Sequence, residues 1–283
     1  MGSTKKDNYN LIIEQYYNEN QVLYSLFWSK DALHYGFWEQ DTKTISEAVL
    51  NSTVFVCKCL EIDKNDVVLD AGCGVGGTSI YIAKKYGAKV YGITLSRVQL
   101  KTAIKKALKS NVADLTHFSK QDFTKTNFKD CTFSKVLGIE SVCYAHKKIS
   151  FLHEAFRLLE KGGKVAIMDG FLIRPNLNKR EKEVYKKFIN GWALPNLSMK
   201  DGFYDDLINA GFKNIQFHDK LKTVRKCCDR IYKLGIGAYP FTLFLSKMRI
   251  IPKNMHGHAI GCINQKKLVN HNMVTYGVFL AEK

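Results

Sequence analysis

A cluster of glycines at residues 72–77 carries the strongest chemical signal in the chain. Residues 67–69 are a short apolar run, typical of a buried strand. Asp70 comes next, and the pattern Gly72-x-Gly74-x-Gly76 begins two residues later. A strand that runs into glycines and opens a helix allows a tight turn and a close approach of the backbone to a ligand. The pattern therefore predicts a cofactor-binding loop.

The spacing of these glycines leaves two cofactor classes open. Gly77 completes Gly-x-Gly-x-x-Gly from Gly72, which is the pattern of dinucleotide-binding loops. Those loops also place an acid about 20 residues further on, where it binds a ribose. The residue at the end of the next predicted strand is Thr94. The missing acid argues against a dinucleotide without excluding one.

Strands and helices alternate from residue 66 to about residue 172. The apolar runs predict strands at residues 67–69, 89–94, 135–139 and 164–169. Ser96 and Gln99 predict a capping box at the start of one helix, and Gly162 is expected to stop another at residues 151–160. This order indicates an α/β protein with a parallel sheet covered by helices on both faces.

The segments on either side of this core differ from it in character. Helices are predicted at residues 8–30 and 46–60, with the aromatic patch His34-Tyr35-Gly36-Phe37-Trp38 between them. Beyond Pro175 we expect helices and loops at residues 176–210, a strand at 212–217, an irregular basic and apolar insertion at 221–272, and a final strand at 274–281. The predicted parts are an N-terminal helical lid segment (1–62), a Rossmann-like core (63–172), and a cap insertion with the final strands (173–283).

Four segments of the chain resemble class I S-adenosylmethionine-dependent methyltransferases. Residues 68–77 look like the first motif of that class, and residues 91–99 are similar to the second-strand segment of the tocopherol methyltransferase branch. Residues 138–146 resemble the fourth-strand segment of sterol C-methyltransferases. Residues 158–164 look like the turn before strand five, with Glu160-Lys161 in place of the usual Lys-Pro. The resemblance spans about residues 34–172 and nearly vanishes in the cap.

The resemblance implies a Rossmann-like sheet, mostly parallel with its last strand antiparallel, and S-adenosylmethionine as cofactor. Its glycine loop follows Asp70, and Gly72, Gly74 and Gly76 would face the methionine part and the sugar. Thr94 would contact the ribose through its hydroxyl. The remaining cofactor candidates are Gln99, Asp122 and Phe123. Gln99 would lie near the ribose or serve only as a helix cap. Asp122 would accept a hydrogen bond from the adenine or be an ordinary loop acid, and Phe123 would flank the adenine ring.

The catalytic candidates lie just past the fourth predicted strand and in the aromatic patch. A carboxylate at Glu140 could stabilise a cation or accept a proton after carbon methylation, or could only bind the cofactor or a backbone amide. Tyr35 could hold a carbocation against its ring, or could pack a helix onto the sheet. His34 and His146 titrate near neutral pH, but a structural role is the commoner one for each.

The resemblance favours C-methylation of a terpenoid, meaning a sterol, a prenylated ring or a prenyl diphosphate. Basic residues in the cap would suit the diphosphate. The alternative is an N- or O-methyltransferase of a small metabolite. A protein that binds the cofactor without turnover is a weaker alternative, because the glycine motif and Glu140 are both intact.

The net charge of +17 admits a nucleic-acid or an anionic-membrane partner, but lysine pairs spread along the chain explain it equally well. The segments that nucleic-acid methyltransferases use after strand four are absent, so we expect no nucleic acid. The basic, apolar residues 221–252 could form a lid or a membrane contact. The polar N-terminus and the lack of a long apolar run predict a cytoplasmic protein. Eight cysteines without C-x-x-C spacing predict reduced thiols and no metal.

Overall fold

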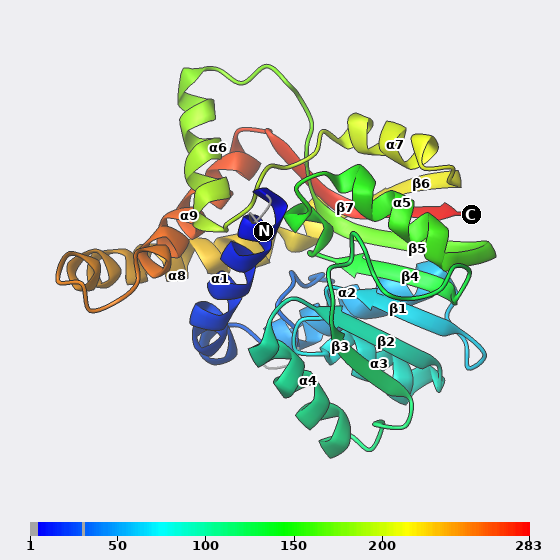
Figure 1. Ribbon diagram of the computed structural model, residues 1–283. Coiled ribbons are helices and arrows are strands. Elements are labelled where there is room, and N and C mark those ends of the chain that lie inside the picture. Colours follow the sequence, from blue (N-terminus) through cyan, green and yellow to red (C-terminus); the bar gives the residue numbers. More distant parts are fainter. Residues whose placement is uncertain (1–4, 30–31) are drawn as a thin grey trace.

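The computed structural model describes residues 5–29 and 32–283, so residues 1–4 and 30–31 of the predicted lid segment lie outside the described residues. Within them a seven-stranded sheet has the order β3-β2-β1-β4-β5-β7-β6 (Figure 1). The strands are β1 Val67–Ala71, β2 Lys89–Thr94, β3 Thr116–Lys120, β4 Phe133–Ile139, β5 Leu159–Leu172, β6 Lys213–Asp219 and β7 Val274–Glu282. Strands β1 to β5 pair in parallel, whereas β7 runs antiparallel to both β5 and β6. The predicted fold class is confirmed.

Two hydrophobic clusters fix the helices to opposite faces of the sheet. On one face, α5 (Lys148–Leu158) and α7 (Lys200–Asn209) bury Phe151 and Phe203 against the strands. On the other face, α2 (Ile45–Leu60), α3 (Gly77–Tyr86) and α4 (Arg97–Lys109) contribute residues such as Val56 and Ile82. The sheet is therefore covered on both sides, as a parallel sheet must be.

Four further helices gather beside the carboxyl ends of the parallel strands (Figure 1): α1 Lys5–Phe27, α6 Lys179–Gly191, α8 Leu221–Lys247 and α9 Lys253–Asn270. Together they form a cap over that edge of the sheet. None of the helices in the described part of the chain is both long and apolar enough to cross a membrane.

The irregular insertion predicted at residues 221–272 is wrong, because α8 and α9 are long helices that pack along each other (Figure 1). Glycine and proline are unfavourable inside a helix, yet α8 continues through Pro240. At Gly235 a Cβ atom would lie 2.7 Å from the Cβ of Cys262, so the glycine lets α9 approach closely. Tertiary packing outweighs local helix propensity here.

Two other local predictions differ from the structure. Helix α5 ends at Leu158, before Gly162, because Leu159 is already extended and pairs with Phe133 of β4. The edge strand β3 was not predicted, since its sequence is largely polar and half exposed. Only half of the predicted capping box forms: Ser96 Oγ accepts from Gln99 N at 3.1 Å, while the Gln99 side chain binds Thr94 instead.

Gly76 is the N-cap of α3 and has a φ of 82°, in the region that favours glycine. A Cβ atom there would lie 2.9 Å from the Cβ of Ala103 and 3.0 Å from the ring of Phe118. The glycine therefore lets α3 pack closely on α4 and β3.

We expect Gly76→Ala to lower the free energy of unfolding by about 1–3 kcal/mol, because it combines backbone strain with overpacking. Urea unfolding followed by circular dichroism measures this. The matched control is Gly202→Ala in α7, where a Cβ atom would make only an ordinary contact, 3.7 Å from Met199. The control is expected to lose nothing. Equal stabilities for the two variants would contradict this account of Gly76.

Candidate active site

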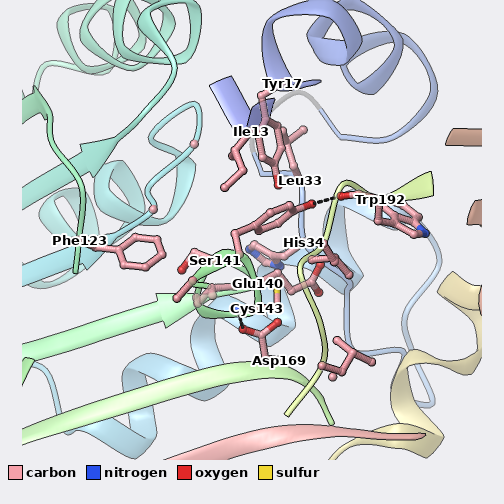
Figure 2. A pocket seen from close by; sticks show the side chains of 18 of the residues that line it. Ile13, Tyr17, Leu33, His34, Phe123, Glu140, Ser141, Cys143, Asp169 and Trp192 are labelled. Carbon is pink, nitrogen blue, oxygen red and sulfur yellow. Dashed lines mark hydrogen bonds between the residues drawn. The ribbon is translucent and has the colours of Figure 1, made fainter. Parts of the chain in front are cut away.

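A cavity of about 460 Å³ lies where the carboxyl ends of β1, β2, β4 and β5 meet the cap. In Figure 2 Phe123 lies at one end and Trp192 at the other, with Glu140, Cys143 and Asp169 between them. Ile13, Tyr17 and Leu33 of the N-terminal segment cover the cavity (Figure 2). This is the position at which open α/β sheets bind ligands.

The glycine loop forms the floor of one end of the cavity. Asp70 is buried, accepts a 2.6 Å hydrogen bond from Ser79 Oγ, and has its pKa raised by burial to about 6. Gly72 has a φ of +92° and leaves no room for a Cβ, which would lie 2.3 Å from the Cβ of Ser141. Gly74 has a φ of +53°, and a Cβ there would point toward Gln99, whose Nε2 is 4.0 Å away.

Gly76 is the one predicted cofactor residue that does not line the cavity. Its close contacts are with Ala103 and Phe118, so the structure gives it a packing role between elements. The other cofactor candidates, Asp70, Gly72, Gly74, Thr94, Gln99, Asp122 and Phe123, all line the cavity.

Side chains beyond β2 and β3 are held by hydrogen bonds around the same end. Thr94 Oγ1 donates to Gln99 Oε1 at 3.0 Å. Asp122 accepts from Thr124 N at 2.8 Å through one carboxylate oxygen and from Asn10 Nδ2 at 3.0 Å through the other. Phe123 packs edge-on against Phe151, with ring centroids 5.4 Å apart. The polar groups here are fixed before any ligand arrives.

The charge of the cavity suits a cationic ligand. Among the described residues that line it are five carboxyl groups, from Glu14, Asp70, Asp122, Glu140 and Asp169, and one lysine or arginine, the exposed Lys147. S-adenosylmethionine carries a sulfonium and an ammonium group, so the lining fits it. A dinucleotide pyrophosphate would be repelled by the same acids, and that alternative loses its support.

Glu140 directly follows β4 and lines the centre of the cavity. Its Oε1 accepts hydrogen bonds from the Tyr35 backbone N–H at 2.7 Å and from the Tyr276 hydroxyl at 2.5 Å. Burial raises the pKa of Glu140 to about 8; the two hydrogen bonds oppose the shift, and the Asp169 charge adds to it. With no cation beside it, Glu140 is therefore mostly protonated at neutral pH.

Two functional residues were missed by the sequence analysis. Asp169 lies within β5, accepts from Cys143 N at 2.9 Å, and has its pKa raised by burial to about 6. An acid at the end of the apolar run 164–169 was a usable signal for it. Tyr276 gave no signal, because only the antiparallel pairing of β7 with β5 brings it opposite Gly170 and beside Glu140.

The aromatic patch divides between the site and the core. Tyr35 lines the cavity, and its ring centroid is 5.4 Å from that of Tyr276. Phe37 is buried in the core, and Trp38 donates from Nε1 to Cys227 Sγ at 3.2 Å; neither lines the cavity. Only Tyr35 of the three is therefore placed to meet an acceptor.

The two candidate histidines lie in different environments. His34 lines the cavity too but is buried, with its Nδ1 3.3 Å from Ser52 Oγ, and burial lowers its pKa to about 4, so it is neutral at pH 7. His146 lines the cavity but is exposed, with its ring edge-on to Tyr9 at a centroid distance of 6.2 Å.

The end of the cavity under the cap is apolar. Leu221 and Val224 of α8, Leu268 and Val269 of α9, and Val274 of β7 line it. The basic cap residues Lys222, Arg225, Lys226, Arg230 and Lys233 are all exposed, and none of them lines the cavity.

Gln265 of α9 is a polar exception at this end. It is 4% exposed, and neither its amide nitrogen nor its amide oxygen makes a hydrogen bond within the protein. The amide lies near the Cys228 thiol, a weak partner that cannot satisfy an amide.

Comparisons with known proteins show which family the chain belongs to. Residues 4–221 match the family model described as mycolic acid cyclopropane synthetase. The chain is 28% identical to a sterol 24-C-methyltransferase of Saccharomyces cerevisiae over 77% of its own length and 59% of that protein's. It is 32% identical to the chloroplastic tocopherol O-methyltransferase of Arabidopsis thaliana over 55% of its own length and 48% of that protein's. The chain thus spans about half to three fifths of these two curated relatives.

The structure of the cyclopropane synthase MmaA2 from Mycobacterium tuberculosis superposes with a TM-score of 0.82 over 97% of this chain and 98% of that one, at 15% identity. Fold, glycine loop and acid-lined cavity together define a class I methyltransferase, whose cofactor is S-adenosylmethionine. Within that class, the chain belongs to the mycolic acid cyclopropane synthetase family.

We expect Glu140→Gln to stabilise the cofactor-free protein more at pH 8 than at pH 5. A carboxyl whose pKa rises from 4.5 to about 8 on folding costs stability as pH increases between those values, by about 1.4 kcal/mol per pH unit. Below pH 4.5 it is protonated in both states and costs nothing. Glutamine keeps the oxygen that accepts from Tyr35 and Tyr276. Urea unfolding at the two pH values gives the difference, and the same difference at both would contradict the raised pKa.

Proposed function

We propose that this protein transfers the methyl group of S-adenosylmethionine to a carbon of a small, largely apolar acceptor, of the terpenoid class that includes sterols and prenylated rings. The observation that carries the proposal is Glu140, a buried carboxyl with a raised pKa between two tyrosines and beside an apolar cavity. The sterol 24-C-methyltransferase relative supports an apolar acceptor and a carbon as the methylated atom.

In this proposal the residues at the strand ends hold the cofactor, and its sulfonium supplies an electrophilic methyl group. Gly74 leaves open space beside Gln99, Thr94 and Asp122 offer polar atoms, and Phe123 offers a ring. Because the leaving group is excellent, the protein contributes chiefly by orienting the acceptor and excluding water.

Glu140 is the group proposed to respond to positive charge. A cation in the cavity favours the ionised form and lowers the pKa of Glu140. Both hydrogen bonds fall on Oε1, so Oε2 is the oxygen free to accept a proton from the methylated acceptor. The rings of Tyr35 and Tyr276 lie beside it and can stabilise positive charge on the acceptor carbon.

The exposed cap cations do not line the cavity, so they give no support to a prenyl diphosphate within the terpenoid class. The alternative function is O- or N-methylation of a small metabolite, which the 32% identity to a tocopherol O-methyltransferase favours.

The direct test is methyl transfer from radiolabelled S-adenosylmethionine into a crude cell extract, partitioned between organic and aqueous phases. We expect label in the organic phase, and an initial rate about 10²–10⁴-fold lower for Glu140→Gln, because the general base is lost. Glu160→Gln, at an exposed residue of β5, is the control and should label normally. Label confined to aqueous metabolites would favour the alternative or a diphosphate, and label in RNA would contradict both functions.

We further propose that the acceptor carries one neutral polar group, a hydroxyl or carbonyl, that hydrogen-bonds to Gln265. A buried amide without partners costs stability unless a ligand satisfies it. Gln265→Met should therefore raise the unfolding free energy by about 1 kcal/mol or more and lower the methylation rate. Asn264→Leu is the control, since that buried amide donates to Ile260 O at 2.8 Å, so its loss should not stabilise. A Gln265→Met protein that is less stable or fully active would refute this role.

A further inference from the structure

The helical hairpin of α8 and α9 has a base inside the protein and a tip outside it. The buried residues of α8 end at Gly235, and those of α9 begin at Ala259. Between them, no described side chain of residues 236–258 is buried. Figure 1 shows the turn between α8 and α9 projecting away from the sheet, whereas residues 254–258 return to the other cap helices, where Asn254 donates to Glu19 and His258 contacts Tyr16. We call residues 236–251 the hairpin tip.

The hairpin tip carries large apolar side chains that are exposed rather than buried in a hydrophobic core. Phe241, Phe244 and Ile250 are 72%, 63% and 64% exposed, and Met248 is 59% exposed. Ile236 and Tyr239 extend the same exposed group toward the base. So many large exposed apolar side chains on one short segment mark an interaction surface.

The charged residues of the hairpin tip itself have one sign, although Glu19 of α1 accepts from Asn254 near its inner end. The sequence has no aspartate or glutamate between Asp229 and Glu282. Lys233, Lys247 and Arg249 are exposed beside the apolar side chains. Apolar side chains flanked by cations, with no acid among them, match a surface that is apolar beneath a layer of negative charge.

The base of the same hairpin forms part of the cavity. Val224 and Cys228 of α8 and Leu268 and Val269 of α9 line its apolar end. The hairpin therefore connects the cavity physically to the exposed tip. An apolar acceptor of the proposed kind partitions into lipid. A hairpin tip bound to a lipid surface would therefore place the cavity close to the membrane that holds the acceptor. This link alone rests on the proposed function.

We propose that the hairpin tip docks the protein onto an anionic phospholipid bilayer, with the phenylalanines entering the interface and the cations facing lipid phosphates. The protein remains peripheral, in keeping with helices that do not span a membrane in the described part of the chain.

The test is flotation of the full chain with vesicles, with neither cofactor nor acceptor added. Vesicles of phosphatidylglycerol and phosphatidylcholine (about 30:70) are compared with pure phosphatidylcholine. We expect binding to the anionic vesicles that weakens with added salt, because exposed charges are screened. The double variant Phe241→Ser/Phe244→Ser should lower the partition coefficient by about tenfold or more. Lys247→Glu/Arg249→Glu should lower it by a similar factor and abolish the preference for anionic lipid.

The matched controls are Ile208→Ser in α7, which is 51% exposed on the far side of the sheet, and Lys101→Glu/Lys105→Glu on the exposed face of α4. Both should bind vesicles as the unmodified protein does. Absence of vesicle binding at low salt, or equal loss in tip and control variants, would overturn the proposal. So would tip variants that bind vesicles normally but change the oligomeric state. Because no methyl transfer is measured, the result is independent of the proposed reaction.

Discussion

The structure depends on burying carboxyl groups near the carboxyl ends of parallel strands, with Lys148 acting on Asp169. Asp70 lies in β1, Glu140 directly follows β4 and Asp169 lies in β5, and burial raises the pKa of all three. Such burial is costly unless hydrogen bonds or a bound cation offset it. Ser79 supports Asp70, Tyr35 and Tyr276 support Glu140, and the Cys143 amide supports Asp169. A bound cation would therefore offset part of the free-energy cost of burying these carboxyl groups.

The segments outside the parallel strands supply hydrogen bonds to Glu140 and the apolar wall of the cavity. The N-terminal segment delivers the Tyr35 amide to Glu140, and β7 delivers the Tyr276 hydroxyl. Lys148 at the start of α5 donates to Ala145 O, Asn196 O and Asn196 Oδ1, which fastens the segment after α6 over the site. Helices α8 and α9 then close the apolar end. The candidate cofactor residues therefore lie at the sheet, and the apolar end of the cavity belongs to the cap.

The region matched by the family model ends where the helical hairpin begins. The matched region ends at Leu221, which is the first residue of α8. The strand ends, the glycine loop and Glu140 lie inside the match, whereas Gln265 and the hairpin tip lie beyond it. The residues proposed for the chemistry lie in the region matched by the family model, and those proposed to bind the acceptor and a lipid surface lie in the part of the chain that the model does not cover.

The sequence alone determined the features that depend on neighbouring residues. The strand–glycine–helix unit at Asp70 and Gly72, the threonine at the end of β2 and the acid after β4 are local patterns. They predicted the fold class, and the family resemblance that they carry implied the cofactor and made Glu140 a candidate. Only the tertiary structure decided the rest. Tyr276 reaches Glu140 across 136 positions through the sheet order, Gly76 is explained by Ala103 and Phe118 rather than by a ligand, and Gly235 lets α8 pack closely on Cys262 of α9. These outcomes rest on contacts between distant segments, whose energies no local pattern encodes.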